Sequence, residues 1–161
     1  MRIAALAAGL MIAGAACAAA PDARRFADWT LLEVPGQGCV LQYRAVAPGS
    51  GLVLADLYLS PVAEGGAILS VRVPVGASIA DRAVYRHLGA GRAVPLIWQT
   101  CNRQTCLAQV HVTEEEIGRL RAGRAIELAF VPVPGARRLS FPVSLMGVTA
   151  GLRAALACTS W

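Results

Sequence analysis

The sequence contains no lysine, so all fifteen basic residues are arginine, and ten acidic residues leave a net charge of +5. Charged residues make up only 16% of the chain and aromatic residues only 6%, whereas 56% of the residues are hydrophobic. A disordered chain would be richer in charge and poorer in apolar residues, so the composition indicates a folded protein. The scarcity of aromatic side chains leaves little for bases to stack on, and we expect no nucleic-acid partner.

Motifs for common enzyme chemistry are also missing. Ser144 lies in Val-Ser-Leu rather than in a nucleophile elbow, and Gly89-Ala90-Gly91 lacks the third glycine of a nucleotide-binding fingerprint. The only histidines, His87 and His111, are far apart and neither belongs to a zinc-ligand pattern. The one acidic cluster, Glu114-Glu115-Glu116, is explained by a solvated first turn of a helix. The sequence therefore predicts a protein that is not an enzyme and holds no metal or cofactor.

A strongly apolar segment occupies residues 1–20, in which all but three residues are apolar. One early arginine, an apolar middle and a small-residue end, Ala18-Ala19-Ala20, are typical of a secretory signal peptide. The segment just reaches the ~18 residues that a membrane anchor needs. Its high alanine content, and the Pro21 that follows in place of an aromatic or basic anchor, favour a cleaved signal.

Cys17 offers a third interpretation of this segment, a lipoprotein anchored through an acylated cysteine. Gly14 stands where lipoprotein signals carry a bulky aliphatic residue, so we favour simple cleavage. Both secretory interpretations remove Cys17 from disulfide pairing. The sequence thus predicts a periplasmic or secreted protein in which residues 21–161 form a single domain.

Short apolar segments separated by glycine and proline predict a chain made mainly of strands. In the segment 67–73, Ser70 and Arg72 fall on one face, and Trp29 is expected to be a buried anchor. Strands at this spacing favour an antiparallel sandwich or barrel. The expected strands are residues 29–34, 39–46, 52–60, 67–73, 83–88, 92–99, 107–112, 125–131 and 139–143.

Two segments are expected to form helices. Residues 113–123 begin with Thr113 and Glu116 at capping-box spacing and should pack through Ile117 and Leu120. The second helix is expected at about 147–157. It should present Val148, Leu152 and Leu156 on one face.

Four cysteines remain after the signal, and an even count in an oxidising compartment favours two disulfides. Cys101 and Cys106 flank a four-residue loop between two expected strands, which a bridge can span. That leaves Cys39 to pair with Cys158. The alternative is thiol–disulfide exchange at Cys101 and Cys106, but such chemistry usually requires a C-x-x-C sequence at a helix N-terminus.

Arginines are frequent between residues 76 and 106. Arg82, Arg86, Arg92 and Arg103 would form a binding surface for anionic lipid, lipopolysaccharide or an acidic partner if they share a face. Peripheral association with a membrane would be one consequence of such a surface.

Several segments resemble one family of exported bacterial proteins. They are Phe26-Ala-Asp-Trp29-Thr, the strand around Cys39, Cys101-Asn-Arg-Gln-Thr-Cys106-Leu-Ala, Leu120-Arg-Ala-Gly123, and Phe141-Pro-Val-Ser-Leu-Met-Gly147. In order and spacing, these segments resemble the invasion-associated locus B family. The resemblance covers nearly all of residues 26–157.

The resemblance implies an immunoglobulin-like antiparallel β-sandwich with one or two short helices, exported past the inner membrane and without known catalytic residues. Members often carry a cysteine shortly after the tryptophan that pairs with the one matching Cys39. Here Leu31-Leu32-Glu33 occupies that position, so the bridge to Cys158 would be a relocated one. We expect an exported, non-enzymatic envelope protein that binds a protein or an envelope component. The alternative is a periplasmic redox protein that uses Cys101 and Cys106.

Overall fold

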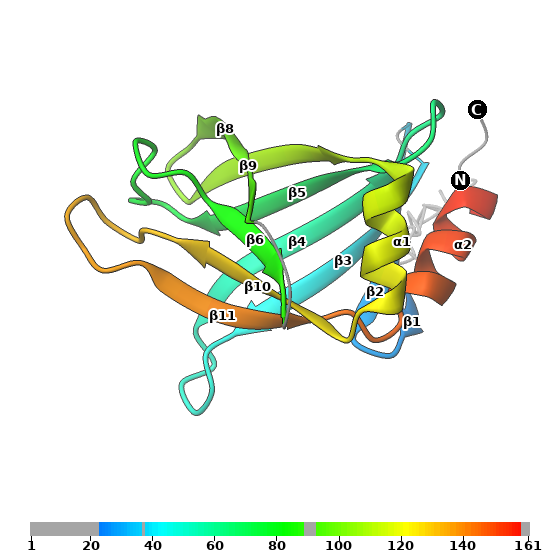
Figure 1. Cartoon of the computed structure of the whole chain (residues 1–161), viewed down its shortest axis with the longest axis horizontal. Helices are drawn as coiled ribbons and strands as arrows, with labels where there is room; N and C mark the ends of the chain where they lie inside the picture. The colour runs from blue at the N-terminus through cyan, green and yellow to red at the C-terminus, as the bar shows by residue number, and fades with distance from the viewer. Residues whose placement is uncertain (1–22, 37, 89–92, 159–161) are drawn as a thin grey trace, which may run out of the picture.

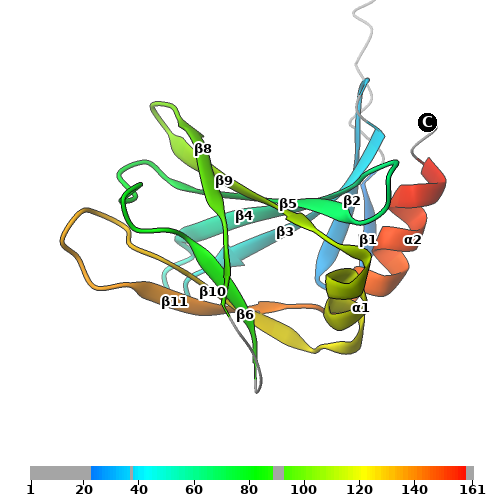
Figure 2. The same ribbon diagram turned by 45° about the horizontal axis from the view of Figure 1, so that its top comes forward.

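The computed structural model describes residues 23–36, 38–88 and 93–158. Two antiparallel sheets face each other across the hydrophobic core (Figures 1 and 2). The larger sheet has seven strands in the order β1-β2-β3-β4-β5-β9-β8, and the smaller has four in the order β11-β10-β6-β7. Two separate sheets with two short helices make the fold a β-sandwich, as predicted.

The strands and helices follow the sequence pattern closely. Among the described residues the elements are β1 (Arg24–Phe26), β2 (Trp29–Val34), β3 (Gly38–Val46), β4 (Val53–Pro61), β5 (Ala67–Pro74), β6 (Val84–His87), β7 (Val94–Pro95), β8 (Ile97–Cys101), β9 (Thr105–Val112), α1 (Glu114–Ala122), β10 (Ala125–Phe130), β11 (Leu139–Ser144) and α2 (Val148–Cys158).

Alternation along the central strands divides the larger sheet into an inner and an outer face. Leu57 and Leu59 of β4 are buried, and so are Leu69 and Val71 of the neighbouring β5. The residues between them therefore point outward. Ser70 and Arg72 share this outer face, which confirms the prediction that the two lie on one face, and Tyr58 lies beside Ser70 on β4.

The prediction of one strand over 92–99 is wrong. The chain forms the short β7 in the smaller sheet, then β8 in the larger sheet, and the two are separated by Leu96. Leu96 is fully buried, and its backbone N–H donates to the carbonyl of Ala83 at 2.8 Å. The buried leucine thus marks the point where the chain crosses from one layer to the other.

Both helices lie at one end of the sandwich (Figure 1). α1 begins at the N-cap Thr113, whose side chain accepts from the N–H of Glu116, and it packs through Ile117 and Leu120 as expected. α2 buries Val148, Gly151, Leu152 and Ala155. Val148 and Leu152 of the expected face are buried, whereas Leu156, nearer the end of the helix, is 43% exposed.

Candidate functional site

The first candidate is the pair Cys101 and Cys106, which face each other across the β8–β9 ladder with Cα atoms 4.0 Å apart and are joined by a disulfide. Asn102 closes the turn, because its Oδ1 accepts from the N–H groups of Gln104 and Thr105, both at 2.8 Å. Cys106 is 1% exposed. The pair therefore lies on a β-hairpin rather than at a helix N-terminus, where a redox thiol gains a lowered pKa.

The second pair joins β3 to the last turn of α2. Cys39 is bonded to Cys158 across 119 positions of sequence, with Cα atoms 5.8 Å apart. Gly151 lies so close to β3 that a Cβ there would be 2.5 Å from Cδ2 of Leu41. The bridge and this contact hold α2 on the inner face of the larger sheet. Both cysteine pairs are those expected from the sequence.

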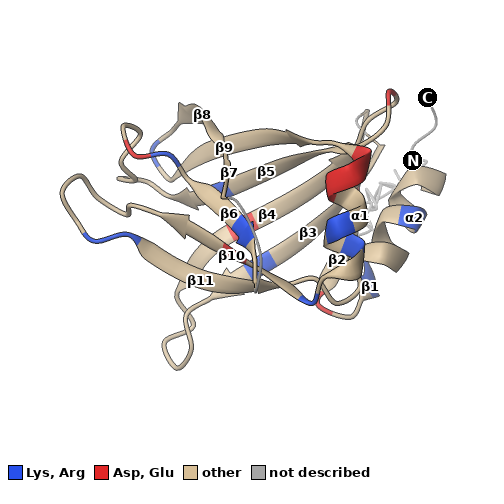
Figure 3. Ribbon diagram, viewed as in Figure 1, with Lys and Arg blue, Asp and Glu red and all other residues tan. Residues whose placement is uncertain are grey.

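The four arginines predicted to bind do not form one cluster. Arg86 lies on β6 and pairs with Glu127 of β10, with Nε to Oε1 at 3.1 Å. Arg82 lies in the β5–β6 loop and Arg103 in the β8–β9 turn, and both are exposed. Figure 3 shows these two connections at the end of the sandwich away from the helices. Arg92 lies outside the described residues. A binding role for these arginines stays a prediction.

The interpretation of Glu114-Glu115-Glu116 as a wholly solvated turn is wrong for Glu116, which is 7% exposed. Its Oε1 accepts from the Tyr85 hydroxyl at 2.9 Å and lies 2.6 Å from Nε2 of His87. Its Oε2 accepts from Nη1 of Arg119 at 2.6 Å. We call Tyr85, His87, Glu116 and Arg119 the Glu116 cluster.

The electrostatics of the Glu116 cluster favour an ionised carboxylate. Burial alone would raise the pKa of Glu116, but the hydrogen bonds from His87, Arg119 and Tyr85 outweigh burial and lower the pKa. Burial, reinforced by the hydrogen bond to Glu116, raises the pKa of Tyr85. A charged carboxylate whose two oxygens are both engaged suits a link between α1 and β6 better than proton transfer.

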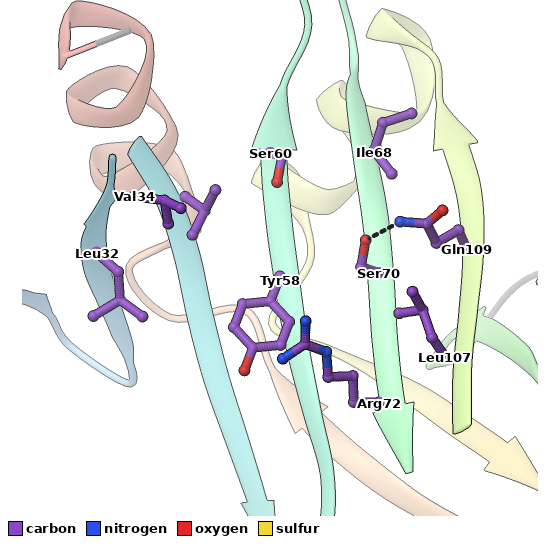
Figure 4. A pocket seen from close by; sticks show the side chains of 10 residues that line it. Leu32, Val34, Tyr58, Ser60, Ile68, Ser70, Arg72, Leu107 and Gln109 are labelled. Atoms are coloured by element: carbon purple, nitrogen blue, oxygen red, sulfur yellow. Dashed lines mark hydrogen bonds between the residues drawn. The ribbon is translucent and has the colours of Figure 1, made fainter. Parts of the chain in front are cut away.

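A groove of about 510 Å³ crosses the outer face of the larger sheet. The sequence did not predict it, although the shared face of Ser70 and Arg72 was a usable signal. The groove combines apolar walls with a polar floor (Figure 4). The apolar lining is Leu32, Val34, Val40, Ile68 and Leu107, and the polar lining is Tyr58, Ser60, Ser70, Arg72 and Gln109.

The polar floor is ordered by two side-chain amides. Gln42 donates to the Tyr58 hydroxyl at 3.2 Å, and Gln109 donates to the Ser70 hydroxyl at 2.8 Å. Since both hydroxyl oxygens already accept a hydrogen bond, both O–H groups remain to donate elsewhere. The Arg72 guanidinium lies 5.2 Å from the centre of the Tyr58 ring, a cation–π contact.

Arg72 keeps its positive charge available. The nearest carboxylate across the β4–β5 ladder is that of Asp56. Asp56 accepts from Arg44 through both oxygens, at 2.7 and 3.2 Å. The row Arg44, Asp56, Arg72 therefore carries one excess positive charge beside the groove.

Two segments that carry the family resemblance lie against each other. The indole N–H of Trp29 donates to the Ser144 carbonyl at 2.9 Å, and the Ser144 hydroxyl donates to Oδ2 of Asp28 at 2.5 Å. Trp29 is 1% exposed, which confirms its expected place in the core. Gly147 has a φ of 98°, and a Cβ there would be 1.8 Å from the Phe26 carbonyl oxygen. These contacts give the shared segments a structural role.

The described part of the chain contains no cluster of three or more His, Cys, Asp or Glu side chains that could hold a metal ion. Its helices are all too short, or not apolar enough, to cross a bilayer. The expected signal peptide, Cys17 included, lies outside the described residues.

Comparison with known proteins identifies the family. The family model for the invasion associated locus B (IalB) protein matches residues 16–156. Among solved structures, the chain is similar to the crystal structure of invasion associated protein B from Bartonella henselae, with a TM-score of 0.74 and 19% identity. That match covers 84% of this chain and 96% of the other, and it supports the sandwich fold. No curated protein matches the chain. Because the family model spans most of the sequence, the chain belongs to the invasion associated locus B family.

Proposed function

We propose that this protein is an exported, non-enzymatic envelope protein that binds its ligand in the outer groove of the larger sheet. The groove carries the proposal, because it is the place where apolar walls, two free hydroxyl donors and a guanidinium converge. Family membership supports an invasion-associated envelope protein. The apolar, small-residue segment 1–20 supports export.

The lining defines the chemistry of the ligand. Tyr58, Ser70 and Arg72 offer donors and a positive charge, so they suit an anionic oxygen such as a carboxylate or phosphate. The aliphatic side chains on either side suit an alkyl portion. The ligand we expect is an envelope component that carries an acidic group beside an aliphatic surface.

Photocrosslinking in the native envelope tests the binding role. A photoreactive residue replaces Ser60 in the groove, and a matched control replaces the exposed Ser140 on β11 of the smaller sheet. We expect a discrete adduct from position 60 only, weakened when Arg72→Gln is added. Equal adducts from both positions, or none from position 60, would overturn the proposal.

The ligand chemistry is tested separately by calorimetry with two amphiphiles of equal chain length. Octyl phosphate should bind more tightly than octyl glucoside, and Arg72→Gln should remove most of the difference. Arg121→Gln on α1 makes the same charge change far from the groove and should leave the affinity as it is. Equal binding of the two amphiphiles would contradict the acidic group.

The redox alternative has weaker support. The Cys101–Cys106 bridge closes a hairpin, and one of its two sulfur-bearing residues is buried. We propose that it is structural and resists reduction by glutathione buffers. Rapid reduction of the Cys101–Cys106 disulfide, with a reduction potential typical of thiol oxidoreductases, would favour the redox function instead.

A further inference from the structure

We infer that the end of the sandwich opposite the helices docks on an anionic lipid bilayer. This surface, here called the loop end, consists of the β5–β6 loop (75–83), the β8–β9 turn (102–104) and the β10–β11 connection (131–138). Figure 2 shows these loops at the end of the molecule away from α1 and α2. The inference does not depend on the groove, which lies on the outer face of the larger sheet.

Hydrogen bonds join the three segments into one surface. The N–H of Val75 donates to the Gln104 carbonyl at 3.0 Å, and the N–H of Ser78 donates to the Val131 carbonyl at 2.9 Å. The Arg138 guanidinium donates through Nη1 to the Arg82 carbonyl at 3.0 Å. The loops are thus positioned relative to one another before any partner arrives.

Three aliphatic side chains project from these loops. Val75 is 51% exposed, Ile79 is 65% exposed and Val133 is 52% exposed. Gly76 lies beside Val133, since a Cβ on Gly76 would be 3.7 Å from Cγ1 of Val133. Single exposed aliphatic residues are ordinary, but three on adjoining loops form an apolar tip that a partner would cover.

Arginines accompany the apolar tip. Arg82, Arg103, Arg137 and Arg138 are all exposed, whereas the one acidic residue of these segments is Asp81. Oδ2 of Asp81 accepts from the Ser78 hydroxyl at 2.8 Å, so this carboxylate is partly engaged. The loop end therefore combines aliphatic side chains with a clear excess of positive charge. An anionic bilayer matches both, because its phosphates attract arginine and its acyl region accepts aliphatic side chains.

Vesicle sedimentation tests this inference with the mature chain. The vesicles contain phosphatidylethanolamine and phosphatidylglycerol at 7:3, or phosphatidylcholine alone. Binding is expected to the anionic vesicles, and Arg103→Gln with Arg137→Gln should lower it roughly twenty- to thirtyfold. The control, Arg121→Gln with Arg153→Gln, removes the same charge at the helical end and should lower it less than about threefold.

Two further arms separate a bilayer from other partners. Ile79→Ser with Val133→Ser should lower vesicle binding at least about tenfold, since burial of the aliphatic side chains is lost. The groove has its own test in the octyl phosphate titration, so failure of this inference is distinguishable from failure of the groove. Equal losses in the loop-end and control arginine variants would overturn the inference. The inference would also be overturned if the Ile79→Ser, Val133→Ser variant bound vesicles as well as wild type and soluble polyglutamate displaced the vesicles equally from both. That result would indicate an acidic polymer as the partner instead.

Discussion

Glu116 joins α1 to β6, a strand of the smaller sheet. Its carboxylate accepts from Tyr85 on β6 and from Arg119 on its own helix. We expect Glu116→Gln to lower the free energy of unfolding by about 2 kcal/mol. An amide has only one acceptor oxygen, so some of the groups that donate to the Glu116 carboxylate lose their acceptor. Urea denaturation measures the effect. Glu115→Gln is the matched control: Glu115 is exposed and pairs only with Arg119, so its loss should cost less than about 0.5 kcal/mol.

The same carboxylate gives the stability a pH dependence. The folded pKa of Glu116 lies below its ordinary value of 4.5, because the three hydrogen bonds outweigh burial. The stabilisation is therefore fully present above the unfolded pKa and is lost as the pH falls through the folded pKa. The stability difference between wild type and Glu116→Gln should shrink as the pH falls below 4.5. A difference that grows on acidification would contradict this account of the cluster.

Gly147 and Gly118 form an instructive pair for substitution by alanine. At Gly147 the positive φ and the nearby Phe26 carbonyl both exclude a side chain, so Gly147→Ala should destabilise the fold by at least about 2 kcal/mol. Gly118 lies exposed within α1, where a Cβ meets nothing within 4 Å. Gly118→Ala should stabilise by about 0.5–1 kcal/mol through helix propensity. Thermal unfolding of the two variants should shift in opposite directions.

At the scale of elements, periodicity and capping explain why most strands and both helices could be predicted. Thr113 and Gly123 bound α1, and two-residue alternation located β5 and its two faces. The three-residue β1 carries too little pattern to be detected. The split of 92–99 depends on Leu96 entering the core between two sheets, which is a tertiary effect.

The candidate site was less predictable for the same reason. The groove forms because β5 pairs with β9, with β6, β7 and β8 between them in sequence, and alternation does not specify such a partner. The Glu116 cluster did leave a signal. Glu116 lies on the same helix face as Leu120, and Tyr85 and His87, two positions apart, lie on the same face of a short strand. A carboxylate on an apolar helix face needs partners, and two polar aromatic side chains were available.

The two disulfides should differ in their effect on stability. In the chain-entropy account, the stabilisation grows with the length of the closed loop. Cys39 and Cys158 are 119 positions apart, whereas Cys101 and Cys106 are 5 apart. Replacing the first pair by alanine should cost about 5 kcal/mol and replacing the second about 2 kcal/mol. Chemical denaturation of the two double variants gives the comparison, and equal losses would contradict the relation to loop length.

At the scale of the whole molecule, the β-sandwich places the two proposed binding surfaces on different parts of the protein. The groove lies on the outer face of the larger sheet, and the loop end lies beyond the strand ends opposite α1 and α2. If the protein docks on a bilayer through the loop end, the groove lies near the bilayer surface without being covered by it. The groove would then remain open to an envelope component that carries an acidic group.

Formation of the two disulfides should depend on export from the cytoplasm. When the full sequence is expressed in a Gram-negative host, we expect the periplasmic protein to begin at Ala19, Ala20 or Pro21, because small residues precede these positions. Its intact mass should also lack the hydrogens removed by two disulfides. A control lacking residues 1–20 should stay in the reducing cytoplasm, carry four free thiols by alkylation and unfold at lower denaturant concentration. A mature chain beginning with an acylated Cys17 would contradict simple cleavage and show that a lipid anchor holds the protein at the membrane.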